Sequence, residues 1–203
     1  MPRSYLTTFF NDYAPRFDQH MEELRYVAPR LLADAVLTEG SRQFDEAVDL
    51  GCGTGLVGAL FRPHVRHFVG VDLAAAMIAA SRKRGVYDEL ANEDVVDYLR
   101  RRETLVDLLL AADVLIYLGD LGDLFAAVAA RLRGGGLFAF SIEATDSCDY
   151  RLQASRRYAH SPNYIRRLAA SHQWAESASE ECSLRAQADG RENGVVFVYR
   201  RGA

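Results

Sequence analysis

Three glycines at every second position offer the clearest chemistry in this sequence. Gly51, Gly53 and Gly55 lie in the run A-V-D-L-G-C-G-T-G-L-V-G, between Ala47 and Gly58. Glycine accepts positive φ angles and leaves the main chain open to a ligand, where any Cβ would collide. In open α/β sheets, nucleotides bind to such turns at the carboxyl end of a strand. We therefore expect a nucleotide-like ligand on this loop.

Two acidic residues narrow the choice of ligand. Asp49 lies two positions before the first glycine, where a carboxylate would repel a pyrophosphate but attract a positively charged tail. Asp72 ends the next apolar run and can accept hydrogen bonds from both hydroxyls of a ribose. Gly53, Gly55 and Gly58 also spell G-x-G-x-x-G, a weak dinucleotide signature. The residues favour a nucleoside with a cationic tail, with a nicotinamide-dependent oxidoreductase or epimerase as the alternative.

The order of strand, D-x-G-x-G-x-G loop, helix, strand and acid resembles the class I S-adenosylmethionine (SAM)-dependent methyltransferases. Three further stretches are similar to a narrower bacterial family, the methyltransferase domain often found behind tetratricopeptide repeats. They are F-N-D-Y-A-P-R-F-D-Q-H-M (10–21), L-A-A-D-V-L-I-Y-L-G-D-L-G-D (110–123) and residues 150–167, which include R-Y-A-H-S and Y-I-R-R. The resemblance implies SAM as the methyl donor and S-adenosylhomocysteine (SAH) as the product, and it leaves the acceptor open.

The same resemblance implies a donor site assembled from several strand ends. Asp49 would face the methionine end, Asp72 the ribose and Asp94 the amino group of the adenine. The implied donor-binding residues are Tyr13, Asp49, Gly51, Gly53, Asp72, Leu73, Met77, Asp94, Val95, Ala111 and Ala112. Asp72 and Asp94 both precede predicted helices, so helix capping is the alternative role for each. Glu93 is a rival for the role of Asp94.

Methyl transfer from SAM requires few acidic or basic groups in the protein. A sulfonium methyl group is already activated, so the rate depends mainly on placing the acceptor in line with it. A general base helps only where the acceptor is protonated at neutral pH. The candidates for a catalytic role are His160, Tyr158 and His20, with Tyr117 and Glu143 as further possible bases. A surface or capping role is the alternative for each histidine.

The long connection over residues 143–164 should lie on the acceptor side. In a doubly wound sheet the ligand lies outside the carboxyl ends of the strands, so the chain leaving the fifth strand passes over this half of the site. We expect Arg157, Tyr158 and His160 at the mouth of the pocket, and a small acceptor that is polar or anionic. The alternative is that Tyr158 and His160 only anchor the following helix.

The hydrophobic pattern predicts an α/β fold. From Ala47 onward strand-like and helical runs alternate, as in a parallel sheet with helices on both faces. Strands are expected near 46–51, 67–71, 86–91, 106–112, 136–142, 178–187 and 193–200, and helices near 55–62, 75–84, 94–102, 121–132 and 162–171. The resemblance implies a Rossmann-like seven-stranded sheet of order 3-2-1-4-5-7-6 with the last strand antiparallel. We predict a single domain over residues 1–203, with an N-terminal helical lid (1–38) and a core (44–203).

The composition limits the partners. The formal net charge of −4 gives no general attraction to nucleic acid. The 3 cysteines lack C-x-x-C spacing, which predicts neither a disulfide framework nor a zinc site, and no apolar run reaches membrane-spanning length. We expect a cytoplasmic monomer or homodimer that acts on a small molecule, with no nucleic acid, membrane or metal partner. A non-catalytic SAM-binding protein is the alternative to an enzyme.

Overall fold

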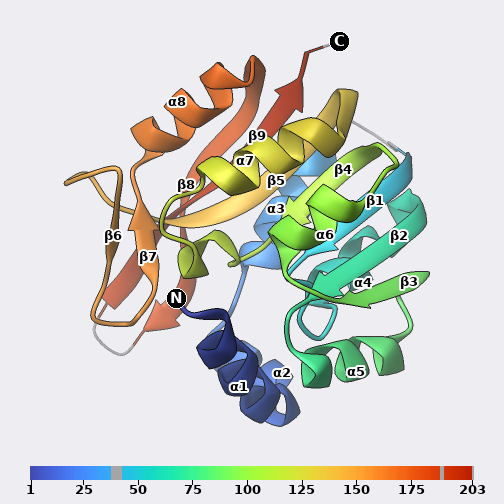
Figure 1. The fold of residues 1–203 in the computed structure, drawn as a ribbon. Helices are drawn as coiled ribbons and strands as arrows, with labels where there is room; N and C mark the ends of the chain where they lie inside the picture. Colours follow the sequence, from blue (N-terminus) through green and yellow to red (C-terminus); the bar gives the residue numbers. More distant parts are fainter. Residues whose placement is uncertain (38–42, 188–189, 203) are drawn as a thin grey trace.

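The computed structural model describes residues 1–37, 43–187 and 190–202, which form a nine-stranded sheet flanked by helices (Figure 1). The first five strands of the sequence are parallel to one another, and they are β1 (Phe44–Leu50), β2 (Val65–Asp72), β3 (Glu89–Asn92), β4 (Val106–Ala111) and β5 (Leu132–Ala144). Next to β5 lies β9 (Gly190–Arg201), which pairs antiparallel with it, and β8 (Trp174–Gln187) pairs antiparallel with β9. The order β3-β2-β1-β4-β5-β9-β8 confirms the predicted arrangement.

Two short strands raise the number of strands above the predicted seven. The connection expected to be a loop contains β6 (Tyr150–Leu152) and β7 (Tyr158–His160), which pair antiparallel with each other. Glu143 of β5 is in register with Ala159 of β7 and with Gly194 of β9. Because a strand has two edges, β7 lies on the edge of β5 opposite β9, in line with β4. Strands of three residues give little periodicity in sequence and depend on this pairing for their formation.

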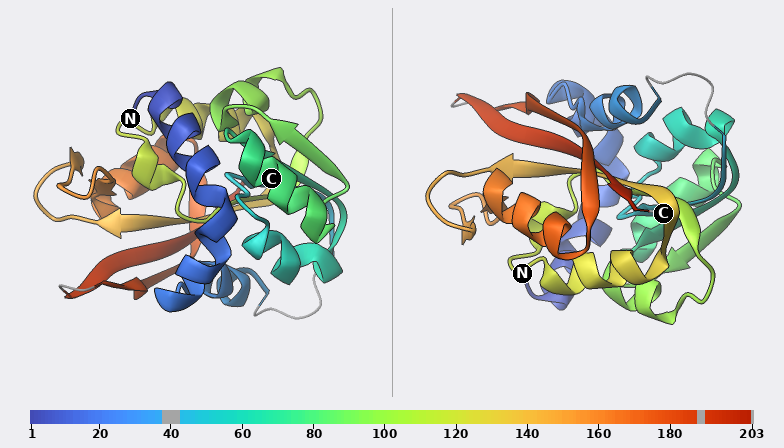
Figure 2. Two further views of the ribbon diagram at one scale, coloured as in Figure 1. Left: turned by 90° about the horizontal axis from the view of Figure 1, so that it is seen from below. Right: turned by 90° about the horizontal axis from the view of Figure 1, so that it is seen from above.

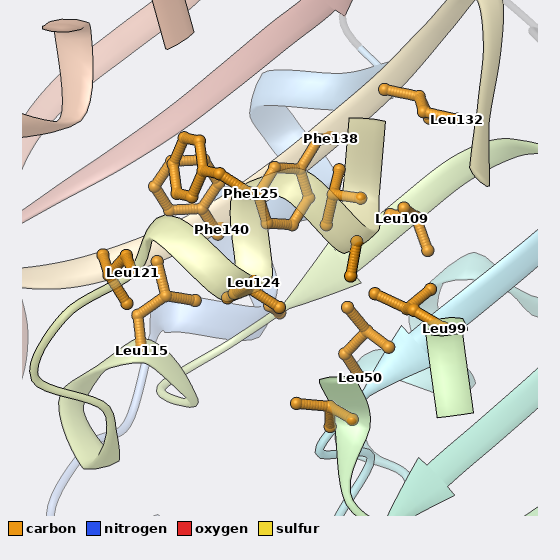
Figure 3. Close-up of a cluster of buried hydrophobic side chains, with 14 of the residues drawn as sticks. Leu50, Leu99, Leu109, Leu115, Leu121, Leu124, Phe125, Leu132, Phe138 and Phe140 are labelled. Atoms are coloured by element: carbon orange, nitrogen blue, oxygen red, sulfur yellow. The ribbon is translucent and has the colours of Figure 1, made fainter. Parts of the chain in front are cut away.

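The central strands are apolar on both faces because helices cover both faces. In β4 and β5, Leu109 pairs with Phe138, and both side chains are fully buried. One face packs against α6 (Val95–Arg101), α7 (Gly122–Arg131) and α8 (Pro162–Ser171), and Figure 3 shows part of this core. The other face packs against α3 (Ala28–Leu37) and α4 (Leu56–Phe61).

The third strand begins later than predicted. Gly85, with φ of 70°, ends α5 (Ala75–Arg84), and residues 86–88 are not part of the strand. The ring of Tyr87 instead packs edge-on against Phe68, with a centroid distance of 4.8 Å. A Cβ on Gly58 would lie only 2.4 Å from this ring. The apolar character of the segment therefore serves packing beneath the glycine loop rather than strand pairing.

The N-terminal helices lie across the carboxyl ends of the strands, as the view from below in Figure 2 shows. They are α1 (Arg3–Tyr13), the 3₁₀ turn η1 (Ala14–Arg16) and α2 (Phe17–Glu23). The next helix, α3, begins at Ala28, so Pro29 lies in its first turn, where a proline loses no hydrogen bond. The expected boundary between lid and core falls at residues 38–42, outside the described residues. In the part of the chain that the structure describes, no helix has the length and apolar content to cross a membrane.

Candidate functional site

One cavity of about 540 Å³ lies between the N-terminal helices and the carboxyl ends of β1, β2 and β4. Its walls come from the glycine loop, the turns after β2 and β3, the segment after β4, and α1 and α2. The predicted donor residues that line it are Tyr13, Gly51, Gly53, Asp72, Leu73, Met77, Asp94, Val95 and Ala112. Asp49 and Ala111 are fully or almost fully buried and are not among the lining residues.

The glycine loop presents bare backbone to this cavity. Gly51, Gly53 and Gly55 have φ angles of 68°, 53° and 92°, and residues other than glycine rarely adopt such backbone angles. A Cβ on Gly51 would lie 2.4 Å from the Val114 side chain, so only glycine fits there. At Gly53 the nearest atom is a ring carbon of Phe17 at 4.0 Å, which leaves space above the backbone. The loop can therefore support a ligand directly, as the sequence predicted.

Asp72 holds the loop and faces the cavity at the same time. Its Oδ2 accepts a hydrogen bond from the Gly53 amide at 2.9 Å, and its Oδ1 accepts one from the Ala74 amide at 2.8 Å. Burial raises the pKa of this carboxyl group, and the two amides oppose that shift. The residue at the N-cap of α5 is Ala74, and no side chain caps this helix, so Asp72 does not have the alternative capping role. Each oxygen keeps a second lone pair, so the contacts with the two amides and a contact with a ribose hydroxyl are compatible.

Asp94 is a helix cap in the structure. Its Oδ1 accepts the amides of Val96 at 2.9 Å and Asp97 at 3.2 Å, which begin α6, and its Oδ2 lies 3.0 Å from Nε of Arg3. The capping alternative is thus correct, and the contact with adenine stays a prediction. Glu93, the rival acid, does not line the cavity and forms a 2.7 Å ion pair with Arg101.

Asp49 is buried directly behind the loop rather than exposed to the cavity. Its Oδ2 accepts a 2.5 Å hydrogen bond from the hydroxyl of Tyr87. Its Oδ1 is buried and has no hydrogen-bond partner among the described residues. Burial raises the pKa of this carboxyl group to about 7, and the nearby Asp72 contributes in the same direction. The structure therefore shows no direct path from Asp49 to the methionine end of a donor.

Aromatic side chains of the N-terminal helices form much of the wall opposite the loop. Tyr13 and Phe17 pack edge-on at a centroid distance of 5.3 Å, and Phe10 packs edge-on against Tyr117 at 5.3 Å. The hydroxyl of Tyr13 is hydrogen-bonded to Nδ1 of His20, and both side chains line the cavity. Of the predicted catalytic candidates, His20 and Tyr117 line the cavity.

Polar contacts fasten these helices to the core. Asp18 of α2 forms a 2.5 Å ion pair with Arg84 of α5, and its other oxygen accepts a 2.5 Å hydrogen bond from the hydroxyl of Thr54 in the glycine loop. Nε of Arg84 also donates to the Thr54 carbonyl at 2.7 Å. Asn11 of α1 accepts the amide of Ala76, at the start of α5, at 2.9 Å. The contacts tie the cover of the cavity to the loop beneath it.

Tyr158 and His160 do not lie at the mouth of the cavity, contrary to the prediction. His160 is fully buried, and its Nε2 donates to the Gly119 carbonyl at 3.0 Å. Burial lowers the pKa of the imidazole. The ring of Tyr158 lies within 3.1 Å of a Cβ placed on Gly119, so it packs against the same loop. β7 positions both side chains as structural supports, because its pairing with β5 directs them away from the cavity.

Arg157 is the residue of this segment that lines the cavity. Its Nε lies 2.5 Å from Oε1 of Glu143, whose side chain is 2% exposed. Gln153 donates to the other carboxylate oxygen at 2.5 Å. Glu143 is thus occupied by two donors and fixes Arg157 at the wall instead of facing a ligand as a base.

Asp113 is a lining residue that the sequence reasoning missed. Its φ is 54°, a conformation that costs energy for a residue with a side chain. Ser141 of β5 holds it there, since Oγ of Ser141 accepts the Asp113 amide at 2.8 Å and donates to its Oδ1 at 3.0 Å. The available signal was a polar residue directly after the apolar run of the fourth strand, at the edge where ligands bind.

Comparisons with known proteins agree with this geometry. Residues 48–138 match a family model described as a methyltransferase domain. The malonyl-[acyl-carrier protein] O-methyltransferase of Enterobacter lignolyticus is 28% identical over 160 residues, which cover 79% of this chain and 62% of that protein. The ubiquinone biosynthesis O-methyltransferase of Rhodopseudomonas palustris is 32% identical over 93 residues, covering 44% of this chain and 36% of that protein. The chain thus spans less than two thirds of the length of these relatives.

The fold has a solved counterpart. The crystal structure of magnesium protoporphyrin IX methyltransferase from Synechocystis, with bound SAH, superposes with a TM-score of 0.76 at 12% identity and covers 99% of this chain and 100% of that one. At this identity the match speaks for the fold alone. The family model over residues 48–138 and the curated relatives make this chain similar to methyltransferases, among them a probable SAM-dependent methyltransferase of Saccharomyces cerevisiae that is 29% identical over 69% of this chain and 48% of that protein.

Proposed function

We propose that this chain transfers the methyl group of SAM to a small-molecule acceptor. The observation that carries the proposal is that one and the same cavity is lined in one part by Asp72 and Asp94 and in another by Tyr117 and Arg157. A donor held through its nucleoside and an acceptor beside it would share one covered space. Such proximity is the main requirement of an in-line displacement.

The residues present fit SAM. The backbone at Gly53 has open space above it, with Phe17 as the nearest neighbour at 4.0 Å from a Cβ position. Asp72 can accept the ribose hydroxyls, Leu73 and Met77 offer apolar contact, and Val95 offers a backbone amide near Asp94 for the adenine. The small side chain of Ala112 leaves room for the methionine part of the donor. Ala111 and Asp49 lie behind this wall.

SAM supplies a methyl group on a positively charged sulfur, and the chain supplies placement, cover and one proton acceptor. Residues 1–38 form a helical lid that excludes bulk water from the reaction. Residues 44–203 form the core below it, and lid and core belong to a single domain. His20, whose Nδ1 is paired with the hydroxyl of Tyr13, takes up the proton of an acceptor that is protonated at neutral pH. His160 and Tyr158 support the wall from behind.

The acceptor in this proposal is small and polar or anionic. Arg157 is a cation at the cavity wall, and the hydroxyl of Tyr117 and the Tyr13–His20 pair add polar groups to a wall that is otherwise largely aromatic and aliphatic. The curated relatives named above include two O-methyltransferases, which favours an oxygen acceptor. In this proposal the protein is a cytoplasmic monomer or homodimer, and it has no nucleic acid, membrane or metal partner.

Two alternatives lead to different measurements. A nicotinamide-dependent oxidoreductase would bind NAD, whereas a methyltransferase would bind SAM and SAH, and isothermal titration with the three ligands distinguishes them. A non-catalytic SAM-binding protein would bind SAM without transferring its methyl group. Incubation with methyl-labelled SAM and a panel of phenols, carboxylic acids and amines, followed by mass spectrometry, tests transfer. Binding of NAD but not SAM would refute the proposed function.

A further inference from the structure

The turn of the β6–β7 hairpin fixes the side chain of Arg157. The amide of Gln153 donates to the Arg157 carbonyl at 2.8 Å, which closes the turn. The side chains of the same two residues donate to the two oxygens of one carboxylate, that of Glu143 in β5. The side chain of Glu143 is 2% exposed, and its backbone is held in the sheet by pairing with Ala159. The guanidinium group therefore has a buried and rigid support.

Charged side chains are unevenly distributed along the cavity. Among the described residues that line it, Arg157 is the only arginine or lysine. The acidic lining residues lie elsewhere: Asp72 ends β2, and Asp94 and Asp113 lie two residues after β3 and β4. The acids thus follow the strand ends, where the donor is expected, and the cation lies on the hairpin. A ligand group that binds at the hairpin should be anionic, since opposite charges attract.

The geometry of a guanidinium group narrows the choice of anion. It presents five N–H donors in a rigid planar fork that matches the two oxygens of a carboxylate. The bond from Nε of Arg157 to Glu143 is compatible with two further bonds to a planar anion. Because Glu143 is itself anionic, the pair has no net charge, and recognition depends more on the fork than on charge. A carboxylate suits this pair better than a phosphate, whose charge is about twice as large.

The cavity wall beside the hairpin is aromatic. The 3₁₀ turn η3 (Leu115–Tyr117) packs against β7, and Tyr117 lines the cavity. Arg156, the neighbour of the lining arginine, donates to the hydroxyl of Tyr5 in α1 at 3.1 Å. The Tyr5 ring stacks on that of Phe9, a second lining residue, at a centroid distance of 6.2 Å. An aromatic ring attached to the bound carboxylate would therefore pack against aromatic side chains.

We propose that the acceptor is an aromatic hydroxy acid, whose carboxylate is bound by Arg157 and whose hydroxyl oxygen receives the methyl group. The inference rests on the proposed function, since it takes SAM as the donor and His20 as the proton acceptor. Hydrogen bonds from the guanidinium engage the lone pairs of the carboxylate, so the hydroxyl is the nucleophile. The bond from its oxygen to the methyl carbon forms, the carbon–sulfur bond of SAM breaks, and the hydroxyl proton passes to His20. Arg157 then determines specificity, and Glu143 and Gln153 position it.

Binding of 4-hydroxybenzoate and of 4-hydroxybenzamide to the full chain saturated with SAH tests the proposal. The two probes share the ring and the hydroxyl group and differ in the carboxylate, and SAH allows no turnover. In isothermal titration we expect a Kd for the benzoate that is roughly tenfold below that for the benzamide, as for a hydrogen bond between charged groups. Equal Kd values, or no binding of either probe, would overturn the inference.

Two variants assign the preference to the guanidinium. Arg157→Lys keeps a cation beside Glu143, so the protein should fold, but a lysine cannot form the planar fork and the preference for the benzoate should fall. The double variant Glu143→Gln with Arg157→Gln removes both charges of the buried pair together and should abolish the preference. Arg151→Gln is the matched control, because it removes an exposed cation of the same hairpin that does not line the cavity.

The contrary results separate the inference from the proposed function. A preference for the benzoate that survives in Arg157→Lys and in the double variant, or that is lost equally in Arg151→Gln, would overturn the inference alone. With SAM in place of SAH, the wild type should convert 4-hydroxybenzoate to its methyl ether, and a methyl ester or no product from this compound would also overturn the inference alone. Failure of SAM and SAH to bind, or no methyl transfer to any compound of the acceptor panel, would instead overturn the proposed function and the inference with it.

Discussion

Replacement of Asp72 by alanine gives the sharpest test of the donor site. Each carboxylate oxygen accepts one hydrogen bond from a backbone amide, that of Gly53 at 2.9 Å or that of Ala74 at 2.8 Å. Each oxygen has a second lone pair that can accept a ribose hydroxyl. Hydrogen bonds to a charged acceptor contribute about 1.5–3 kcal/mol each, and removal of a buried partner is partly compensated by water. We expect Asp72→Ala to weaken SAH binding by about 1.5–3 kcal/mol, which is roughly a 10- to 150-fold rise in Kd.

The assay is isothermal titration with SAH and with 5′-methylthioadenosine, which has the same ribose but lacks the amino-acid tail. If Asp72 binds the ribose, the loss should be of similar size for both ligands. Asp107→Ala is the matched control, because its carboxylate also accepts two backbone amides, those of Asp45 and Glu46, at the opposite end of the strands. This control should lower thermal stability while leaving SAH affinity unchanged.

Two outcomes would refute the reasoning. A folded Asp72→Ala protein with near-wild-type affinity for SAH would remove the ribose assignment. A loss confined to SAH, with 5′-methylthioadenosine unaffected, would show that Asp72 acts on the tail through the loop, since its bond to Gly53 shapes that backbone. Circular dichroism and the melting temperature of each variant establish whether the protein is folded.

Three further predictions follow from the contacts of the described residues. Arg157→Met should lower the free energy of unfolding by about 3 kcal/mol, because it leaves the carboxylate of Glu143 buried without its cation; urea unfolding measures this. Asp18→Asn should break the ion pair with Arg84, speed hydrogen exchange across α1 and α2, and weaken SAH binding a few-fold. Asp49→Asn should stabilise the unliganded protein by up to about 4 kcal/mol above pH 7, since the raised pKa of Asp49 makes the wild type lose stability as the pH rises from about 4 to about 7.

Each of these has a control and a contrary result. Arg30→Met breaks an exposed pair with Asp34 and should change stability by less than about 1 kcal/mol; an equal loss from both arginine variants would contradict the burial argument. Glu23→Gln alters α2 at a contact within that helix and should leave hydrogen exchange unchanged. Unfolding profiles against pH that run parallel for wild type and Asp49→Asn would show that the carboxyl group titrates normally.

The elements that local sequence defines were predicted closely. The helices over Ala75–Arg84 and Pro162–Ser171 have the predicted bounds, because Gly85 ends the first and a proline begins the second. The third strand was placed three residues too early, since its apolar Tyr87 packs under the glycine loop instead of pairing in the sheet. β6 and β7 were missed because a three-residue strand is stabilised by its partner rather than by its own pattern.

Most of the residues expected to bind the donor line one cavity, and this could be predicted because they follow strand ends directly. Gly51, Asp72 and Ala112 each lie within two residues of the end of a parallel strand, and such ends meet at one edge of the sheet. The narrower resemblance to methyltransferase domains behind tetratricopeptide repeats stays a prediction. Asp113 obeys the same rule, and it was missed because its left-handed backbone depends on Ser141, 28 residues away.

The rule that residues at strand ends line the site does not predict which side chains of the segment 157–160 reach the cavity. Arg157, Tyr158 and His160 are close in sequence, and a loop would have allowed all three to turn toward the ligand. Pairing of Ala159 with Glu143 makes the segment a strand, and in a strand alternate residues point to opposite faces. Tyr158 and His160 therefore share one face, against Gly119, while Arg157 belongs to the other and reaches the cavity. The side chain of this segment that reaches the cavity was decided by a pairing between residues 16 positions apart, which no local pattern reveals.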